Sequence, residues 1–383
     1  MESWHTCVMI KRIYDTLDDF ISPNKCLIIY GARQVGKTTL LKTFLSDKKF
    51  KYRFDSGDNI RLQNVLSSQD FSKILEYARG YELLVIDEAQ QIPNIGMGLK
   101  IIVDQIPGIK IIATGSSSFD LANQVGEPLT GRKRTLTLYP IAQKELLYHH
   151  NKFDLKQMLD DFLVFGSYPE VITANSRDEK IELLTELTNS YILKDILALE
   201  RIKSSKILLD LLKLIAFQVG NLVSLNELAN QLHIDIKTVS RYLDLLEKTF
   251  VITRLGGFSR NPRNEITNKS KYYFVDNGIR NAVISQFNPV DSRNDLGALW
   301  ENFIIIERLK NRSYSNIYGS SYFWRNYNQK EIDLIEDRGG SLFARECKWS
   351  KTKRDSAPKD WKQKYPAADF MTITPDNYLD FIV

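Results

Sequence analysis

Short apolar runs separated by amphipathic segments occupy the chain up to about residue 140. This alternation is typical of a parallel β-sheet covered by helices, in which each buried strand is a brief apolar run. Each run ends in polar or glycine residues, which predicts a loop at its carboxyl end. We therefore expect an α/β fold here, with strands at Cys26–Tyr30, Tyr52–Asp55, Leu83–Ile86 and Lys110–Thr114.

The apolar spacing becomes helical from about residue 145 to 200. Leu183, Leu184 and Leu187 recur at helical intervals, and the sequence Phe165-Gly-Ser-Tyr-Pro169 interrupts the pattern. We interpret this segment as a helical lid.

Residues 204–275 favour three helices followed by a hairpin. Ser224 and Glu227 form a capping-box pattern before one apolar helix, and another helix follows Asp235. Two short helices joined by a tight turn predict a helix-turn-helix. The pair Gly256-Gly257 then predicts the turn of a wing.

The last hundred residues begin with a predicted helix near Leu296–Lys310 and continue as alternating strands. With 383 residues, the chain is long enough for two to four domains. We predict a P-loop core over 1–145, a helical lid over 146–203, a winged helix over 204–275 and a terminal α/β domain over 276–383.

Composition describes an ordinary globular protein of small net charge, +5. The charge is uneven, because residues 201–275 hold twelve Lys or Arg against six Asp or Glu. Cys7, Cys26 and Cys347 lie too far apart for a metal-ligand spacing and are too few for a disulfide framework. With neither an export signal nor an apolar membrane span in the sequence, we expect a cytoplasmic protein that does not enter membranes.

The sequence from Gly31 to Thr38 fits the pattern G-x-x-x-x-G-K-[ST], directly after one predicted strand and before a helix. Glycines in such a loop turn backbone N–H groups toward phosphate oxygens at the helix N-terminus. Lys37 reaches the β- and γ-phosphates of ATP in this arrangement, and Thr38 ligates Mg²⁺. The predicted nucleotide-binding residues of the loop are Gly31, Ala32, Arg33, Gln34, Val35, Gly36, Lys37, Thr38 and Thr39.

The buried strand at Leu83–Ile86 leads into Asp87 and Glu88. A carboxylate at this place holds Mg²⁺, and a second one orients or deprotonates the attacking water. The alternative is that two acidic residues simply end a strand. With the phosphate loop upstream, we predict Asp87 as a metal ligand and Glu88 as a catalytic residue of ATP hydrolysis.

Two further groups are candidates for the same reaction. Thr114 or Ser116, at the end of the next strand, would sense the γ-phosphate, although polar strand ends are common. Arg132 would stabilise transition-state charge in a neighbouring copy, which predicts a ring or at least a dimer. A solvated basic cluster is the alternative for Gly131-Arg-Lys-Arg134.

The motifs GARQVGKTTLL, LLVIDEAQQIP, IIATGSSS, LTGRKRTLTLYPIAQKE and FGSYPEVI occur in this order. Together they resemble the prokaryotic AAA+-type ATPases that end in an uncharacterised carboxy-terminal domain. The resemblance covers nearly the whole chain. It implies an AAA+ core, a winged helix and a restriction-endonuclease-like terminal domain, with Thr114–Ser116 as sensor and Arg132 as a candidate finger.

The predicted second helix of the helix-turn-helix carries Lys237, Thr238 and Arg241 away from its apolar stripe. Such a face would meet DNA phosphates, with the basic residues Arg254, Arg260 and Arg263 following in and after the wing. Winged helices also serve as protein-contact or lid modules, and that alternative stays open.

In the terminal segment, Asp333 and the sequence Glu346-Cys-Lys348 lie on two predicted strands joined by a glycine turn. Period-two alternation puts Glu346 and Lys348 on one face, with Asp333 able to face them. This spacing is similar to the PD-(D/E)xK nuclease signature, in which carboxylates hold Mg²⁺. Glu301 on the preceding helix would complete the site, whereas the alternative is a charged hairpin face.

These features favour an ATPase that hydrolyses Mg-ATP and couples it to DNA binding or remodelling, with an Mg-dependent nuclease as a further possibility. The competing hypothesis is a nucleotide-gated switch that binds a protein partner and carries an inactive nuclease-like domain. A metabolic kinase is a weak third hypothesis, since the sequence shows no acceptor-site constellation.

Overall fold

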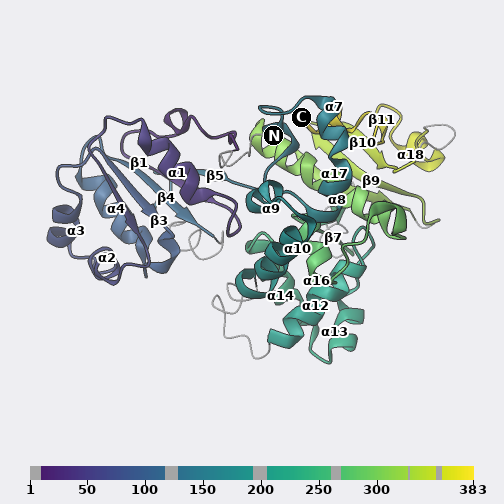
Figure 1. Cartoon of the computed structure of the whole chain (residues 1–383), viewed down its shortest axis with the longest axis horizontal. Coiled ribbons are helices and arrows are strands. Elements are labelled where there is room, and N and C mark those ends of the chain that lie inside the picture. Colours follow the sequence, from purple (N-terminus) through teal and green to yellow (C-terminus); the bar gives the residue numbers. More distant parts are fainter. Residues whose placement is uncertain (1–9, 117–127, 193–204, 260–268, 327, 351–355) are drawn as a thin grey trace. The chain divides into compact units, whose positions relative to one another are not determined.

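The computed structural model describes residues 10–116, 128–192, 205–259, 269–326, 328–350 and 356–383. The chain divides into two compact units (Figure 1). The parallel-sheet unit comprises Lys11–Tyr139 with Lys248–Phe250. The mixed-sheet unit contains Pro140–Glu247 and Val251–Val383. The lid, winged helix and terminal domain predicted from the sequence all fall in the mixed-sheet unit, and the boundaries between them stay predictions.

The parallel-sheet unit is built on five strands in the order β2-β3-β4-β1-β5. Every neighbouring pair is parallel, so all five carboxyl ends lie at one edge of the sheet. Because β4 lies between β1 and β3, its end is adjacent to the loops that follow both. The strands are β1 (Lys25–Tyr30), β2 (Tyr52–Ser56), β3 (Leu83–Asp87), β4 (Lys110–Gly115) and β5 (Lys133–Thr137), and the four predicted strands are confirmed.

Strand β5 is the one the sequence pattern did not predict. It pairs with β1 at the sheet edge, from Cys26 opposite Lys133 to Tyr30 opposite Thr137. An edge strand buries few side chains, and here Leu136 is buried while Arg134 is exposed. The apolar signal was therefore too weak to distinguish this strand from a solvated basic cluster.

Helices cover both faces of this sheet, with α2, α3 and α4 on the side away from α1 (Figure 1). Alternate residues of the strands, such as Ile28, Ile86 and Ile111, pack with Leu99 and Ile102 of α4 in one apolar core. The helical elements are η1 (Leu17–Asp19), α1 (Lys37–Ser46), α2 (Ile60–Leu66), α3 (Phe71–Ala78), η2 (Ala89–Gln91) and α4 (Ile95–Gln105).

The mixed-sheet unit contains six strands in the order β11-β10-β9-β8-β6-β7. The hairpin after the helix-turn-helix and the terminal strands are therefore one continuous sheet, joined where β6 pairs with β8 in parallel. The strands are β6 (Ile252–Gly257), β7 (Lys271–Phe274), β8 (Ser320–Arg325), β9 (Glu331–Arg338), β10 (Ser341–Cys347) and β11 (Asp369–Ile373).

Gly256 and Gly257 are the last two residues of β6, so the prediction that they form the turn of a wing is wrong. They pair with Tyr322 and Phe323 of β8. A Cβ atom on Gly257 would lie at ordinary contact distance, 3.5 Å, from the Phe323 ring, and one on Gly256 would meet no atom within 4 Å, so packing does not require glycine at either position.

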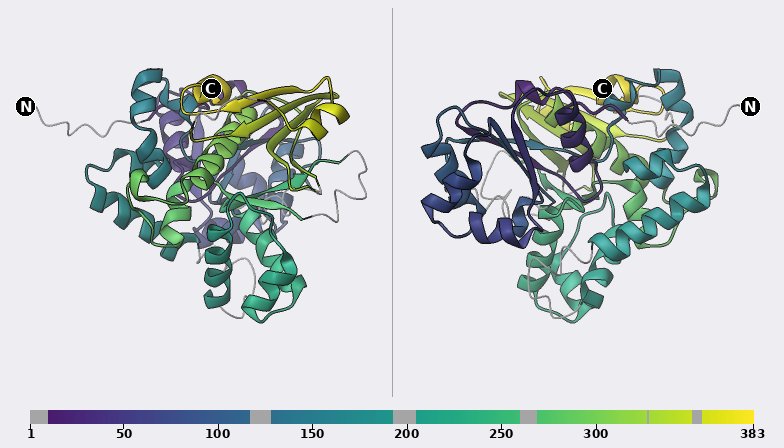
Figure 2. Two further views of the ribbon diagram at one scale, coloured as in Figure 1. Left: turned by 90° about the vertical axis from the view of Figure 1, so that its right-hand side faces the viewer. Right: turned by 60° about the vertical axis from the view of Figure 1, so that its left-hand side comes forward.

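The two helices of the predicted helix-turn-helix are present as α13 (Leu225–Leu232) and α14 (Ile236–Lys248). Val239, Tyr242 and Leu246 of α14 are buried. Asp235 accepts hydrogen bonds from the backbone N and the Oγ1 of Thr238, at 2.8 and 2.7 Å, which caps this helix. Ser224 makes no side-chain capping bond, so the predicted capping box does not form. In both views of Figure 2, these helices lie at the end of the unit opposite β10 and β11.

The longest helix in the described part of this unit is α17 (Leu296–Tyr314), which packs against β7, β10 and α19. Trp300 of α17 is fully buried and donates to the Ile373 carbonyl of β11 at 3.3 Å. The helical elements are α6 (Gln143–Leu146), α7 (Lys152–Gln157), α8 (Leu159–Phe165), α9 (Pro169–Thr173), α10 (Arg177–Glu186), η3 (Leu187–Ile192), α12 (Ser205–Phe217), α13 (Leu225–Leu232), α14 (Ile236–Lys248), α16 (Asn277–Val283), η4 (Val290–Ser292), α17 (Leu296–Tyr314), α18 (Lys359–Lys364) and α19 (Tyr378–Ile382).

Candidate functional site

The predicted phosphate loop connects β1 to α1, and its glycines are required by the backbone. Gly36 has φ of +93°, a conformation that L side chains rarely adopt. A Cβ on Gly31 would lie 2.1 Å from the Leu138 carbonyl oxygen. These two positions therefore exclude other residues, while Ala32, Arg33, Gln34 and Val35 complete the turn, and Thr39 lies in α1.

Lys37 is buried, and its ammonium lies within the loop. Its Nζ donates to the carbonyls of Gly31 and Ala32, at 2.9 Å each. Both acceptors are neutral, so phosphate oxygens would form stronger, charge-assisted bonds with the same group. The loop thus holds its lysine ready for an anionic ligand.

Asp87 at the end of β3 is bonded from two sides. Thr38 Oγ1 donates to Asp87 Oδ2 at 2.6 Å, and Thr114 Oγ1 donates to Asp87 Oδ1. The structure therefore brings together Thr38 and Asp87, which the sequence assigned to Mg²⁺, and Thr114, one of its two sensor candidates. Hydroxyl and carboxylate oxygens are the ligands that Mg²⁺ prefers, so Thr38 and Asp87 fit an Mg²⁺ ion.

Glu88 follows Asp87 with φ of +49°, in the left-handed region. Its backbone N donates to Thr114 Oγ1 at 3.1 Å. Gln90 Nε2 donates to the Glu88 carboxylate and, at 3.1 Å, to Ser116 Oγ. Gln90, which the sequence reasoning missed, thereby connects Glu88 to Ser116. The signal that could have indicated this contact was the position of Gln90, two residues after Glu88.

Arg12 was also missed, because nothing in the local sequence marks it. Only 7% of this residue is exposed. Its guanidinium donates to the Val35 carbonyl within the phosphate loop and to the Tyr139 carbonyl at 2.7 Å.

Arg132 lies away from this site within the same chain. Its carbonyl accepts from the Cys26 backbone N at 2.8 Å, which places it at the amino end of β1. The phosphate loop follows the carboxyl end of that strand, roughly 15–20 Å away. The Arg132 side chain forms an ion pair with Asp104 at 2.6 Å. A role for Arg132 in a neighbouring copy stays a prediction.

A second group of charged residues occurs in the mixed-sheet unit, where the predicted nuclease-like residues converge. The pairing of β9 with β10 sets Asp333 beside Glu346 and Cys347, and the Cys347 backbone N donates to Asp333 Oδ2 at 2.8 Å. Lys348 Nζ lies 2.7 Å from Glu346 Oε1. The hairpin geometry expected from period-two alternation is therefore present.

The sequence reasoning missed Lys271 of β7, which lies at the centre of this carboxylate cluster. Its fully buried Nζ lies 3.0 Å from Glu301 Oε1, 3.7 Å from Asp333 Oδ1 and in contact with Glu331. Tyr273 also donates to Glu301, at 2.6 Å. The signal was nonlocal, because Lys271 precedes Glu301 by a whole helix.

Burial controls the ionisation of the cluster. It raises the pKa of Glu301 to about 7, with the charge of Asp333 adding to the effect. Burial likewise raises the pKa of Asp333, and that of Glu346 with help from Asp333. Burial alone would lower the pKa of Lys271, yet Glu301, Asp333 and Glu331 hold it above its ordinary value.

A divalent ion does not fit these carboxylates as they stand. The Lys271 ammonium already lies between Glu301, Glu331 and Asp333, and Glu346 is paired with Lys348. Across the described part of the chain, no group of three or more His, Cys, Asp or Glu has the arrangement of a metal site. A cleft of about 760 Å³ opens beside Glu346 and Lys348.

Comparisons with known proteins match three families to three different parts of the chain. Residues 23–147 match the AAA domain family. Residues 156–290 match a domain of unknown function, DUF8612, and residues 296–377 match another, DUF4143. The AAA match supports an ATPase.

Two relatives that match most of the chain are described only as uncharacterised proteins. A protein of Haemophilus influenzae is 27% identical and covers 82% of this chain and 80% of its own length. One from Methanocaldococcus jannaschii is 26% identical, over 85% of this chain and 75% of its own. These similarities assign no activity to the mixed-sheet unit.

Two solved structures of ATPases share weak similarity with the chain. A signal transduction ATPase with numerous domains and a tetratricopeptide repeat sensor, from Pyrococcus horikoshii, is 13% identical, with a TM-score of 0.31 over 82% of this chain and 48% of its own. The FIGL-1 AAA domain in complex with ADP is 14% identical, with a TM-score of 0.25 over 62% and 78%. At these TM-scores, neither carries an argument about this chain.

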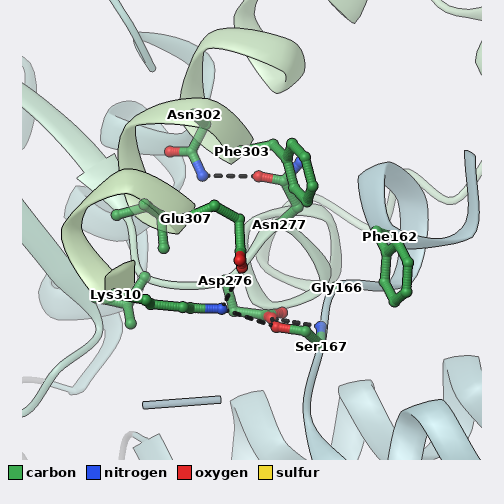
Figure 3. Close-up of a pocket in the computed structure, with 11 residues that line it drawn as sticks. Phe162, Gly166, Ser167, Asp276, Asn277, Asn302, Phe303, Glu307 and Lys310 are labelled. Carbon is green, nitrogen blue, oxygen red and sulfur yellow. Dashed lines mark hydrogen bonds and ion pairs between the residues drawn. The ribbon is translucent and has the colours of Figure 1, made fainter. Parts of the chain in front are cut away.

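The interruption at Phe165–Pro169 proves to be part of a buried polar network (Figure 3). Lys310 Nζ donates to Ser167 Oγ at 3.0 Å and to Glu307 at 2.7 Å. Ser167 donates through its backbone N to Asp276 at 2.7 Å. A Cβ on Gly166 would lie 1.9 Å from Asp276 Oδ1, which explains the glycine.

This network is structural in character. Its cavity of about 10 Å³ holds at most a single water molecule. Ser167 is no activated nucleophile, because Lys310 beside it is paired with Glu307 and Ser167 itself donates to Asp276. Burial raises the pKa of Asp276 and of Glu307, while Lys310 opposes both shifts.

The basic face predicted for DNA contact is exposed on α14. Lys237 and Arg241 are exposed, and so is Arg254 on β6. Arg260 and Arg263 lie outside the described residues. Among the described helices, none is both long enough and apolar enough to cross a membrane.

Proposed function

We propose that the chain hydrolyses Mg-ATP in the parallel-sheet unit and couples hydrolysis to binding or remodelling DNA through the mixed-sheet unit. The single observation that carries the first half is the bonding of Asp87 to Thr38 and Thr114 beside a loop that buries Lys37. The AAA match over residues 23–147 supports the same reading.

Each residue of the site has a distinct role in this proposal. Lys37 exchanges its loop carbonyls for phosphate oxygens. Thr38 and Asp87 would hold Mg²⁺, whose charge offsets that of the phosphates. Glu88 orients the attacking water and accepts its proton, while Thr114, bonded to both Asp87 and the Glu88 amide, reports whether the γ-phosphate is present.

The proposed ATP hydrolysis is tested by measuring phosphate release from ATP by the purified protein, with and without DNA. We expect Lys37→Ala to abolish release and Glu88→Gln to slow it strongly while nucleotide still binds. Equal release by the wild type and Lys37→Ala would refute the proposal.

The DNA half is supported by charge. The exposed Lys237, Arg241 and Arg254 form a basic face around the helix-turn-helix, within a stretch of local excess positive charge. A gel-shift titration across salt tests it, because displacing counterions makes phosphate contacts steeply salt-dependent. Lys237→Glu with Arg241→Glu should weaken binding, whereas binding of DNA that is unaffected by salt and by these changes would contradict the proposal.

Assembly into a ring or dimer belongs to the same proposal, because Arg132 would act only on a neighbouring copy. Mass measurement with and without ATP tests it. A strictly monomeric ATPase would leave Arg132 without a site.

A second candidate function is a nucleotide-gated switch that binds a protein partner and carries an inactive nuclease-like domain. The position of Lys271 among the carboxylates favours it over an Mg-dependent nuclease. Incubation of the wild type with DNA and Mg²⁺ or Mn²⁺ discriminates the two. Cleavage that Asp333→Asn abolishes would restore the nuclease hypothesis, with Asp333, Glu346 and Lys348 as its residues.

A further inference from the structure

Arg12 forms a bridge between the phosphate loop and the end of β5. It precedes β1 in sequence, and its guanidinium lies against the carboxyl end of that strand. The Nη1 atom of Arg12 donates to the Val35 carbonyl, and Nη2 donates to the Tyr139 carbonyl at 2.7 Å. With 7% of the residue exposed, these bonds are shielded from solvent.

The Val35 carbonyl belongs to the same peptide group as the Gly36 backbone N–H. In a trans peptide, the two groups point in opposite directions, so fixing one fixes the other. The structure contains no cis peptide in its described part, and Gly36 begins the first helical bond by accepting from the Leu40 N at 2.9 Å. Because Arg12 holds the Val35 carbonyl, the Gly36 N–H points to the opposite side of this peptide group, away from the guanidinium.

The bond from Arg12 Nη2 to the Tyr139 carbonyl fixes the position of the guanidinium, and with it the Val35 carbonyl. Leu138 N donates to the Tyr30 carbonyl at 2.7 Å, and the Leu138 carbonyl lies against Gly31. The segment that follows β5, through Leu138 and Tyr139, therefore lies against the start of the phosphate loop, while Arg12 links the same segment to Val35 near the end of the loop. The planar fork of arginine reaches both carbonyls at once, which a single ammonium group does not reproduce.

We propose that Arg12 is a positioning residue of the nucleotide site, which orients the Gly36 amide toward the β-phosphate of the bound nucleotide. This inference rests on the proposed nucleotide binding. It predicts that Arg12 strengthens binding of the β-phosphate and leaves binding of the nucleoside unchanged.

The test compares the affinities of AMP and ADP for the wild type, Arg12→Ala and Arg12→Lys. The loop amides cradle the α- and β-phosphates, so ADP should bind more tightly than AMP to the wild type. We expect the ratio of the two affinities to fall about tenfold or more in Arg12→Ala, the scale of a charge-assisted hydrogen bond. Arg12→Lys should also lower the ratio, and it carries the test if the alanine variant does not fold.

Arg134→Ala is a matched control, because Arg134 also donates to a main-chain carbonyl, that of Asp19 at 2.9 Å, but at the exposed sheet edge. Its ADP-to-AMP ratio should equal that of the wild type. A general loss of stability would weaken both nucleotides alike. An unchanged ratio in folded Arg12 variants would overturn the role of Arg12 alone, whereas a wild type that binds no nucleotide would overturn the proposed function with it.

Discussion

Replacing Lys271 with methionine should destabilise the mixed-sheet unit, because it removes the one ammonium group shared by Glu301, Glu331 and Asp333. Methionine keeps most of the volume of the buried side chain, so the change acts chiefly on charge. Removing one partner of a buried ion pair costs about 3–5 kcal/mol, since it leaves uncompensated charge in the interior.

The loss should grow with pH. The pKa of Glu301 is already about 7 in the folded protein, against roughly 4.3 for an ordinary glutamate. Between these values the folded state binds more protons than the unfolded state, so the free energy of unfolding falls as pH rises. Without Lys271, repulsion between the carboxylates raises the pKa of Glu301 and of Asp333 in the folded protein further. The pH range over which the free energy of unfolding falls then extends to higher pH. We expect the full loss near pH 8 and a smaller one near pH 5.5.

Tryptophan fluorescence during urea unfolding measures this unit selectively. Residues 11–139 contain no tryptophan, whereas Trp300, Trp324, Trp349 and Trp361 all belong to the mixed-sheet unit. Lys152→Met is the control, because its ion pair with Asp380 is exposed and should contribute little to stability. A loss below about 1 kcal/mol at pH 8, or one that grows as pH falls, would refute the reasoning.

Three further changes probe the two units. Thr114→Val should lower kcat roughly tenfold or more in steady-state ATPase assays, because Asp87 loses a buried donor; an unchanged kcat would exclude the sensor role. Gln90→Leu should lower kcat with little change in ATP affinity, since the Glu88 carboxylate and Ser116 Oγ lose a donor while Lys37, Thr38 and Asp87 keep their bonds, and equal losses of affinity and kcat would contradict this. Asn302→Leu should cost about 2–4 kcal/mol in urea unfolding, because Asn302 bonds the backbone N and carbonyl of Phe274 and the amide of Asn277; a cost near zero would show that the amide is dispensable.

The sequence predicted the parts of the site that are local. The phosphate loop, with its flanking strand and helix, is specified within a dozen residues, and Asp87 ends a continuous apolar run. Arg12, Gln90 and Lys271 were missed because their partners come from distant elements or from a turn whose geometry no periodicity encodes. Contacts between segments far apart in the chain depend on the packing of the whole unit.

The same limit explains two of the errors in the fold. Strand β5 escaped because an edge strand shows little apolar pattern, and Gly256-Gly257 suggested a turn because glycine is most common there. Neither local preference shows that β6 has a parallel neighbour, β8, which lies more than sixty residues further along the chain. That the hairpin after the helix-turn-helix shares one sheet with the terminal strands was therefore not predictable from the sequence.

This shared sheet bears on how the protein can be divided. A chain cut between α16 and α17 would leave β6 without β8, and the terminal piece would leave β8 without β6. Each fragment would then present an open row of unpaired backbone groups, the kind of edge that recruits strands from other molecules. Limited proteolysis at that junction should therefore yield fragments that stay associated or aggregate, instead of two independently folding pieces.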